Sequence, residues 1–273
     1  MDEFENLKHS QNKYAFVMYN PNSHKINDIL ENRLQVNINK YLSTISWEEK
    51  DSVKYVIFDM SESFRTVIHR HFRHATHIVD TFHYSRYVTD ALNNIRIRIQ
   101  SKYSEKSTEY RILKRYWSPL LKNQLELDDI ISYNPVQQRS TSIFEIINDI
   151  LKLDDELRLG YDLVQSFLYS LHNVKYEEVK EWLDSFISKL KESPSPEFKS
   201  LVKMFRNWYQ EIINSFIRFV DRRLHNGCLE GINNKIKVSA LVCSTLSDHS
   251  SLLNDESKLY LVFIWRLFEI FIK

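Results

Sequence analysis

The first 85 residues contain short apolar runs separated by polar turns, a pattern typical of strands. Residues 14–20 are apolar and aromatic and end at an Asn-Pro-Asn-Ser turn signal, and residues 25–30 are a plausible hairpin partner. Residues 53–60 and 75–83 are two further runs rich in strand-forming residues. These segments predict a sheet in the N-terminal third of the chain.

Helices are predicted between these strands and throughout the middle of the chain. Apolar positions have helical spacing in residues 34–45, and a serine with an acid in the following turn predicts a helix start at residue 61. Residues 86–220 show no convincing strand pattern. Their helical periodicity is clearest in residues 86–99, 142–153, 157–171, 176–190 and 200–224, with breaks expected at residues 118–119, 134–135 and 192–197.

Composition supports long helices, because the 273 residues include only three glycines and 43% are hydrophobic. No run of about 18 uncharged apolar residues is present, and the start of the chain is polar, so we expect neither a membrane span nor a signal peptide. Cys228 and Cys243 have no metal-site spacing and fit a reducing, cytoplasmic location.

Charge is balanced overall, at +1, but it is unevenly distributed along the chain. Residues 86–122 and 199–237 are basic, whereas residues 126–162 between them are acidic. Such runs are usually solvated helix faces. Two basic segments that flank an acidic one can also be the walls of a groove for DNA, and both interpretations stay open.

Three aspartates stand at the predicted strands. Asp2 opens the chain, Asp59 ends the run of residues 53–60, and Asp80 lies near the end of the next. Because neighbouring parallel strands end at one edge of a sheet, such carboxylates can converge on a ligand or metal there. The alternative is that each aspartate caps the helix that follows it.

Glu230 stands between two of the three glycines, Gly227 and Gly231. If this segment is helical, Asn233, Asn234 and Lys237 share a face with the acid, and the missing Cβ atoms let substrate approach closely. The alternative is a capping turn where a loop meets a helix.

Four motifs together resemble bacterial insertion-sequence transposases of the DDE type. They are "MDEF", "YVIFDM", "IVDTFHY" and "NGCLEGINNKIK", in that order. The last is similar to the NG-x-x-EG-x-N-N-K-I-K signature of a zinc-finger-bearing subgroup. The resemblance covers residues 2–238. It implies an RNase H-like fold, an α/β mixed sheet with helices interrupted by an all-helical insertion.

The resemblance implies that Asp2, Asp59 and Glu230 are the catalytic residues and hold two Mg²⁺ (or Mn²⁺) ions. Carboxylate oxygens suit these ions, which can activate an attacking oxygen and stabilise a leaving one. Asp80 and His83 match an auxiliary D-x-x-H signature. We expect the side chains at the DNA to be Arg222, Arg223, Asn233, Asn234, Lys235 and Lys237.

The expected organisation has four parts. Residues 1–90 are the first part of the core, 91–215 the helical insertion, 216–238 the catalytic helix that returns to the core, and 239–273 a divergent tail. The implied function is DNA transposition, with nicking at transposon ends followed by strand transfer to target DNA. A homo-oligomer is left open, and no membrane partner is expected.

Two departures from the family pattern predict a truncated copy. The zinc-binding and helix-turn-helix region that normally precedes the catalytic strand is missing, and the sequence after residue 238 does not match. Two alternatives therefore stay open. One is a catalytically silent remnant that binds DNA or transposase subunits, and the other is a helical scaffold without an active site. Carboxylates of Asp2, Asp59 and Glu230 within about 8 Å of one another would exclude the scaffold.

Overall fold

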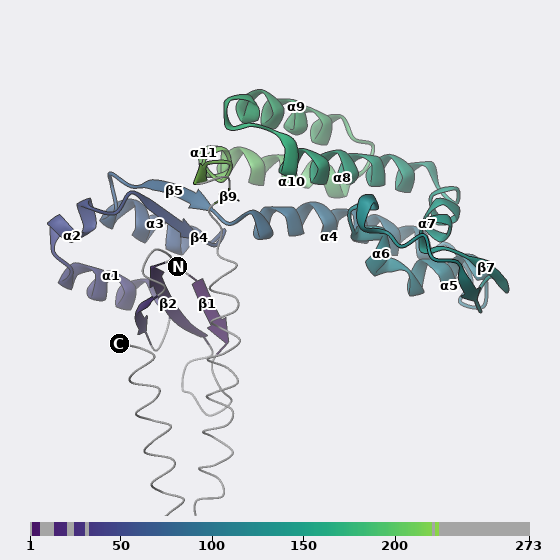
Figure 1. Ribbon diagram of the computed structural model, residues 1–273, viewed down its shortest axis with the longest axis horizontal. Helices are drawn as coiled ribbons and strands as arrows, with labels where there is room; N and C mark the ends of the chain where they lie inside the picture. Colours follow the sequence, from purple (N-terminus) through teal and green to yellow (C-terminus); the bar gives the residue numbers. More distant parts are fainter. Residues whose placement is uncertain (1, 6–13, 21–24, 31–32, 220–221, 224–273) are drawn as a thin grey trace, which may run out of the picture. The chain divides into compact units, whose positions relative to one another are not determined.

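The computed structural model describes residues 2–5, 14–20, 25–30, 33–219 and 222–223. The chain divides into two compact units, Met1–Asp80 with Arg223–Lys273 and Thr81–Arg222, and each is described by itself (Figure 1). The second unit starts with helix α4, Thr81–Gln100, which runs across the boundary predicted at residues 90 and 91.

The first unit contains an antiparallel sheet of three strands, in the order β1-β2-β3. They are β1 (Asp2–Glu5), β2 (Tyr14–Asn20) and β3 (Lys25–Leu30). The predicted strand at residues 14–20 and its hairpin partner are confirmed. A shift of register between Met18 and Tyr19 marks an irregularity in the β2–β3 pair.

A parallel pair of strands, β4 (Tyr55–Phe58) and β5 (Thr76–Val79), forms the other sheet of this unit. Among the described strands it is separate from the three-stranded sheet. The helices are α1 (Gln35–Thr44), α2 (Trp47–Asp51) and α3 (Glu62–His71). Helix α3 packs on β2, where the Phe64 and Phe16 rings lie 5.2 Å apart.

The first unit corrects two details of the sequence interpretation. Strand β5 ends at Val79, and the residues from Thr81 onward belong to α4, so the strand predicted for residues 75–83 was too long. Helix α3 does begin after Ser61, but the Ser61 hydroxyl bonds to the Ser63 hydroxyl at 2.8 Å and not to the backbone.

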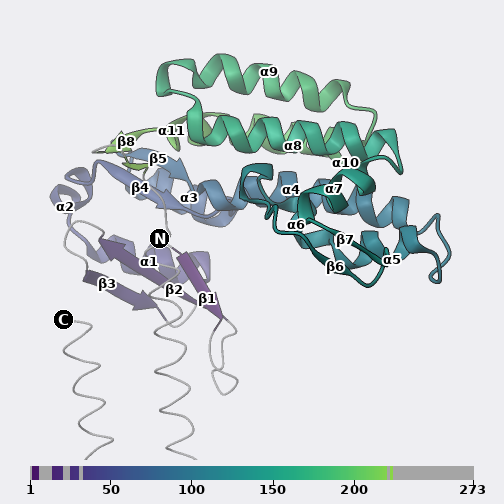
Figure 2. The same ribbon diagram turned by 45° about the vertical axis from the view of Figure 1, so that its right-hand side comes forward.

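The second unit is built from helices that surround an aromatic core. Four long helices lie lengthwise beside one another in Figures 1 and 2: α4, α8 (Asp155–Asn173), α9 (Val179–Glu192) and α10 (Pro196–Asn207). The Phe167 ring of α8 lies 4.9 Å from Phe186 of α9 and 6.3 Å from Phe205 of α10. The shorter helices are α5 (Thr108–Arg115), α6 (Trp117–Leu121), α7 (Ile143–Leu151) and α11 (Tyr209–Asn214).

A β-hairpin in this unit shows that the prediction of an all-helical insertion was wrong. Strands β6 (Ser132–Asn134) and β7 (Arg139–Thr141) pair antiparallel. The Asn134-Pro135 signal, interpreted as a helix break, forms the hairpin turn. There the buried Asn134 side chain accepts a hydrogen bond from the backbone of Val136 at 2.9 Å, a local bond typical of turns.

The prediction of one continuous helix over residues 200–224 was also wrong. Helix α10 ends at Asn207, α11 starts at Tyr209, and Trp208 between them leaves helical geometry with φ −101° and ψ 21°. The Trp208 side chain is buried and continues the apolar spacing of Phe198, Leu201 and Phe205, so the sequence pattern does not mark the break. Two short strands follow, β8 (Arg218–Phe219) and β9 (Arg222–Arg223).

None of the helices that the structure describes is both long enough and apolar enough to cross a membrane.

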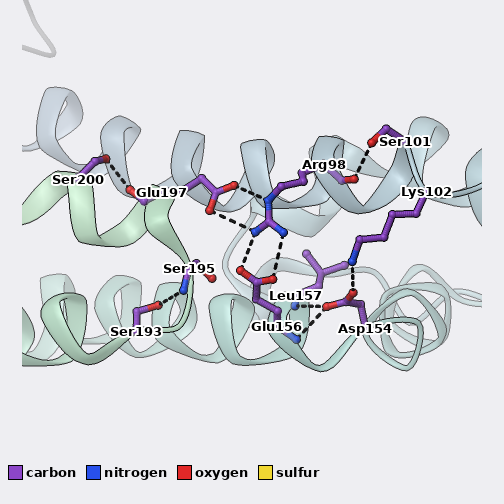
Figure 3. A network of polar contacts seen from close by, with 10 residues as sticks. All are labelled: Arg98, Ser101, Lys102, Asp154, Glu156, Leu157, Ser193, Ser195, Glu197 and Ser200. Atoms are coloured by element: carbon purple, nitrogen blue, oxygen red, sulfur yellow. Dashed lines mark hydrogen bonds and ion pairs between the residues drawn. The ribbon is translucent and has the colours of Figure 1, made fainter.

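An ion network ties three helices of the second unit together (Figure 3). The Arg98 guanidinium of α4 donates to both carboxylate oxygens of Glu156, at 2.6 and 3.1 Å, and to those of Glu197, at 2.8 and 3.3 Å. These hydrogen bonds lower the pKa of both glutamates. Because the acids stand in the first turns of α8 and α10, they also complement the helix dipoles.

Candidate active site

Two buried aspartates meet at the carboxyl edge of the parallel pair β4–β5. Phe58 is aligned with Val79 in the register, so Asp59 and Asp80 are the next residues on neighbouring strands. The Asp80 backbone N–H donates to the Phe58 carbonyl at 3.1 Å, which extends the ladder to this point. Asp59 is 8% exposed and Asp80 is 7% exposed. The expectation that these acids lie at one edge of a parallel sheet is therefore confirmed.

The local sequence explains why the edge falls here. Phe58, Ile78 and Val79 are fully buried apolar residues, which anchor both strands up to the aspartates. After Asp59 the chain turns sharply, and the Ser61 N–H donates to the Asp59 carbonyl at 2.6 Å before α3 begins. Each acid thus stands where an apolar strand ends and the chain must turn.

Asp2 is the first residue of β1, where its backbone is aligned with Val17 of β2. Its carboxylate is not among the described side chains, so its approach to Asp59 stays a prediction. Glu230, together with Asn233, Asn234, Lys235 and Lys237, lies outside the described residues. The predicted cluster of three carboxylates therefore stays a prediction, since only the Asp59 side chain lies within the described residues.

Comparison with protein families decides the family of the chain. The family model for DDE transposases of the ISL3 insertion-sequence type, which is described as "Transposase", matches residues 1–243. The chain belongs to this transposase family. The match confirms the resemblance inferred from the four motifs and assigns the chain to a family of DNA transposition. It argues against the helical scaffold without an active site.

A curated relative gives a shorter match. A protein of Lactococcus lactis subsp. lactis named an ATP-dependent protease is 32% identical over 95 residues, which are 34% of this chain and 27% of that protein. The chain thus matches only about a quarter of the length of that relative. Since most of both chains is uncovered, the activity in that name is a statement about the relative alone. No solved structure is significantly similar to this chain.

The predicted D-x-x-H residues, Asp80 and His83, stand on either side of the start of helix α4. Asp80 is the last residue of the first unit, and His83 lies in the first turn of α4 in the second. The His83 side chain is half-buried, and its ring contacts Phe82 edge-on, with the centroids 5.6 Å apart. The role of this pair stays a prediction.

Asp59 fits the metal that the transposase family implies. Carboxylate oxygens are the hard donors that Mg²⁺ prefers, and Asp59 stands at a strand end beside Asp80, the predicted auxiliary acid. No group of three or more His, Cys, Asp or Glu residues in the described part of the chain could hold a metal ion. The other two predicted ligands, Asp2 and Glu230, have side chains outside the described residues, so the three-carboxylate site stays a prediction.

The basic segment of residues 86–122 divides into cations that lie beside a carboxylate of the described residues and cations that do not, which the sequence did not separate. Arg86 lies 3.5 Å from Asp90, Arg98 holds two glutamates, and Lys102 lies 3.1 Å from Asp154. The remaining members apart from Arg96 are exposed: Lys106, Arg111, Lys114, Arg115 and Lys122. The count of basic residues in this segment therefore overstates the number of cations that could contact a partner.

Proposed function

We propose that this chain is the catalytic part of an insertion-sequence transposase that cuts DNA at transposon ends and joins the ends to a target. The observation that carries the proposal is the register of β4 and β5, which brings Asp59 and Asp80 to one buried edge inside the region of the family match. An RNase H-like arrangement, in which β1 also contributes its acid to this edge, is part of the proposal.

The proposed roles follow from the chemistry of the side chains. Asp59 would hold metal together with Asp2 and Glu230, because ionised carboxylates supply the oxygen ligands that Mg²⁺ or Mn²⁺ needs. A bound pair of such ions would promote in-line displacement at the scissile phosphate by stabilising both the attacking and the leaving oxygen.

The auxiliary pair has a different role in the proposal. Asp80 stands beside Asp59 and would orient it or a water at the edge, since the backbone ladder fixes the two positions. His83 is a poor ligand for these ions because Mg²⁺ prefers oxygen, so its imidazole would position a phosphate oxygen by donating a hydrogen bond.

The proposed partners are the transposon ends and the target DNA. Arg222 and Arg223 form β9 and are followed by the segment that contains Glu230. Together with Lys235, Lys237, Asn233 and Asn234, they would hold the phosphates near the cleavage site. The proposed domain organisation is that residues 91–215 interrupt the core and residues 216–238 return to it.

Nicking of supercoiled plasmid with Mg²⁺ or Mn²⁺ tests the proposal. We expect Asp59→Asn to lower the rate at least about 10³-fold, because metal ions stabilise transition-state charge by several kcal/mol. Asp90→Asn is the matched control, since Asp90 is exposed on α4, and it should keep the rate. Circular dichroism checks that both variants fold.

Two outcomes would count against this assignment. Equal nicking by Asp59→Asn and the unsubstituted chain would show that the edge of β4 is not the active site. Absence of nicking by the unsubstituted chain with either metal, while it still binds DNA, would favour the silent remnant.

A further inference from the structure

Helix α10 presents a row of three cations to solvent, Lys199, Lys203 and Arg206. Each residue of an α-helix turns the chain by about 100° and advances it by about 1.5 Å. The spacings of four and three residues therefore place the three cations within about 60° around the helix and about 10.5 Å along its axis. The row is on the side opposite the buried face of α10, which consists of Phe198, Leu201, Phe205 and the adjoining Trp208.

The row has no acidic neighbours on its own face. The other positions there are Pro196, Ser200 and Asn207. Within the part of the chain that the structure describes, no side chain forms an ion pair with any of the three cations, whereas Lys102 and Lys152 each have a carboxylate at 3.0–3.1 Å. This chain of nearly balanced charge thus leaves one helix face purely basic.

Stability of α10 does not explain the row. Lys199 is the fourth residue of the helix, near the end where the dipole disfavours a cation. Lys199 and Lys203 are like charges four residues apart, which destabilise a helix by a few tenths of a kcal/mol. Only Arg206, in the last turn, is favourably placed. Helix stability therefore does not account for the arrangement.

We propose that Lys199, Lys203 and Arg206 contact DNA phosphates, an inference that rests on the proposed action on DNA. One strand of a duplex advances about 3.4 Å along the duplex axis per phosphate, and neighbouring phosphates lie farther apart than this because the strand winds around the axis. A row of about 10.5 Å can therefore reach two or three phosphates. An acidic protein fits less well, because protein interfaces are anchored by aromatic side chains and this face carries none. Such contacts position DNA without reading its sequence.

The test is a salt titration of DNA binding by the full chain. All variants carry Asp59→Asn and are measured in EDTA with two unrelated 30-base-pair duplexes, so that cleavage plays no part. Replacement of Lys199, Lys203 and Arg206 by glutamine should weaken binding on the order of 10-fold to 100-fold and lower the slope of log K against log salt by up to about 3.

The matched control replaces Lys180, Lys189 and Lys191 of α9 by glutamine. These lysines are also exposed and change the net charge equally, but they do not share one helix face. The control should leave the slope unchanged. Equal weakening by both triple variants would show a general charge effect and overturn the proposal.

Two other results separate this inference from the proposed function. Lost binding to poly-L-glutamate with unchanged DNA affinity would assign the row to an acidic protein and overturn the inference. A reduced salt slope in the α10 variant, together with no nicking by the unsubstituted chain, would support the DNA contact while the catalytic proposal fails.

Discussion

The two units bring acidic side chains together by different means. In the first unit, Asp59 and Asp80 are neighbours because two parallel strands end in register, so the backbone ladder holds them in place. In the helical unit, Glu156 and Glu197 meet because the guanidinium of Arg98 binds both. One pair is placed by main-chain hydrogen bonds, and the other is placed by a counter-charge.

This difference predicts a separate role for each pair of acids. The backbone ladder fixes the main chain of Asp59 and Asp80 at the strand edge, and carboxylates placed there are oxygen donors of the kind that a divalent metal ion prefers. Acids positioned by a counter-charge have that charge already neutralised, which serves helix packing. Loss of an acid in the first unit should therefore affect chemistry, and loss of Arg98 should affect stability.

The largest loss of stability is expected from a substitution in the aromatic core of the helical unit. Phe167→Ala should lower the free energy of unfolding of the helical unit by about 3–5 kcal/mol, because Phe167 is fully buried among Phe186, Phe205 and Tyr84. Chemical denaturation measures this. Tyr169→Ala, at an exposed position of the same helix, should cost less than about 0.5 kcal/mol.

Hydrogen exchange of the Phe167→Ala variant tests whether the two units unfold separately. If the units are separate, Phe167→Ala should speed exchange of backbone amides in α8–α10 and leave those of β4 and β5 unchanged. Equal loss of protection in β4 and β5 would show one cooperative unit, and the separation of a catalytic from a stabilising region would fail.

Removal of the shared cation is expected to have a moderate effect. Arg98→Met keeps the aliphatic stem but leaves Glu156 and Glu197 facing each other, so the helical unit should lose about 1–2 kcal/mol. This figure is reduced for solvent screening, because the Arg98 side chain is 38% exposed. Arg86→Met removes an exposed pair with Asp90 and should cost about 0.3–0.5 kcal/mol.

The same network predicts a pH dependence. Hydrogen bonds from Arg98 lower the pKa of Glu156 and Glu197 in the folded state. Carboxylates with a depressed folded pKa stabilise the fold above their unfolded pKa of about 4.3, and this stability is lost as pH falls through the folded values. Thermal melting from pH 6 to pH 3 should thus show a smaller pH dependence in Arg98→Met than in the unsubstituted chain.

The strand edge was predictable from the sequence because its signals are local. An apolar run such as "YVIF" followed by an aspartate marks both the strand and its end, and the next run repeats the pattern at Asp80. Parallel pairing then follows from the helix between the two strands. The parallel pair β4–β5 and the two edge acids were therefore available before the structure.

The Arg98 network and the hairpin were not predictable in this way. Glu156 is 58 residues from Arg98 in sequence and Glu197 is 99, and no spacing rule links positions on different helices. The hairpin was missed because strands of three residues are too short to show period-2 alternation. The break at Trp208 was missed because this buried residue continues the helical spacing of the buried side chains before it.

The smallest effect tests a local contact at the edge of the network. Asp154 is the N-cap of α8, where its carboxylate accepts from the backbone N–H groups of Glu156 at 2.9 Å and Leu157 at 3.2 Å. Asp154→Ala should cost about 1 kcal/mol, since these N–H groups lose their partner. The adjacent Asp155→Ala is the control. Asp155 has no cap bond and contributes only to the dipole, so a few tenths of a kcal/mol is expected. Urea denaturation of both variants measures the difference, and equal losses would mean that charge, and not the cap geometry, stabilises the start of α8.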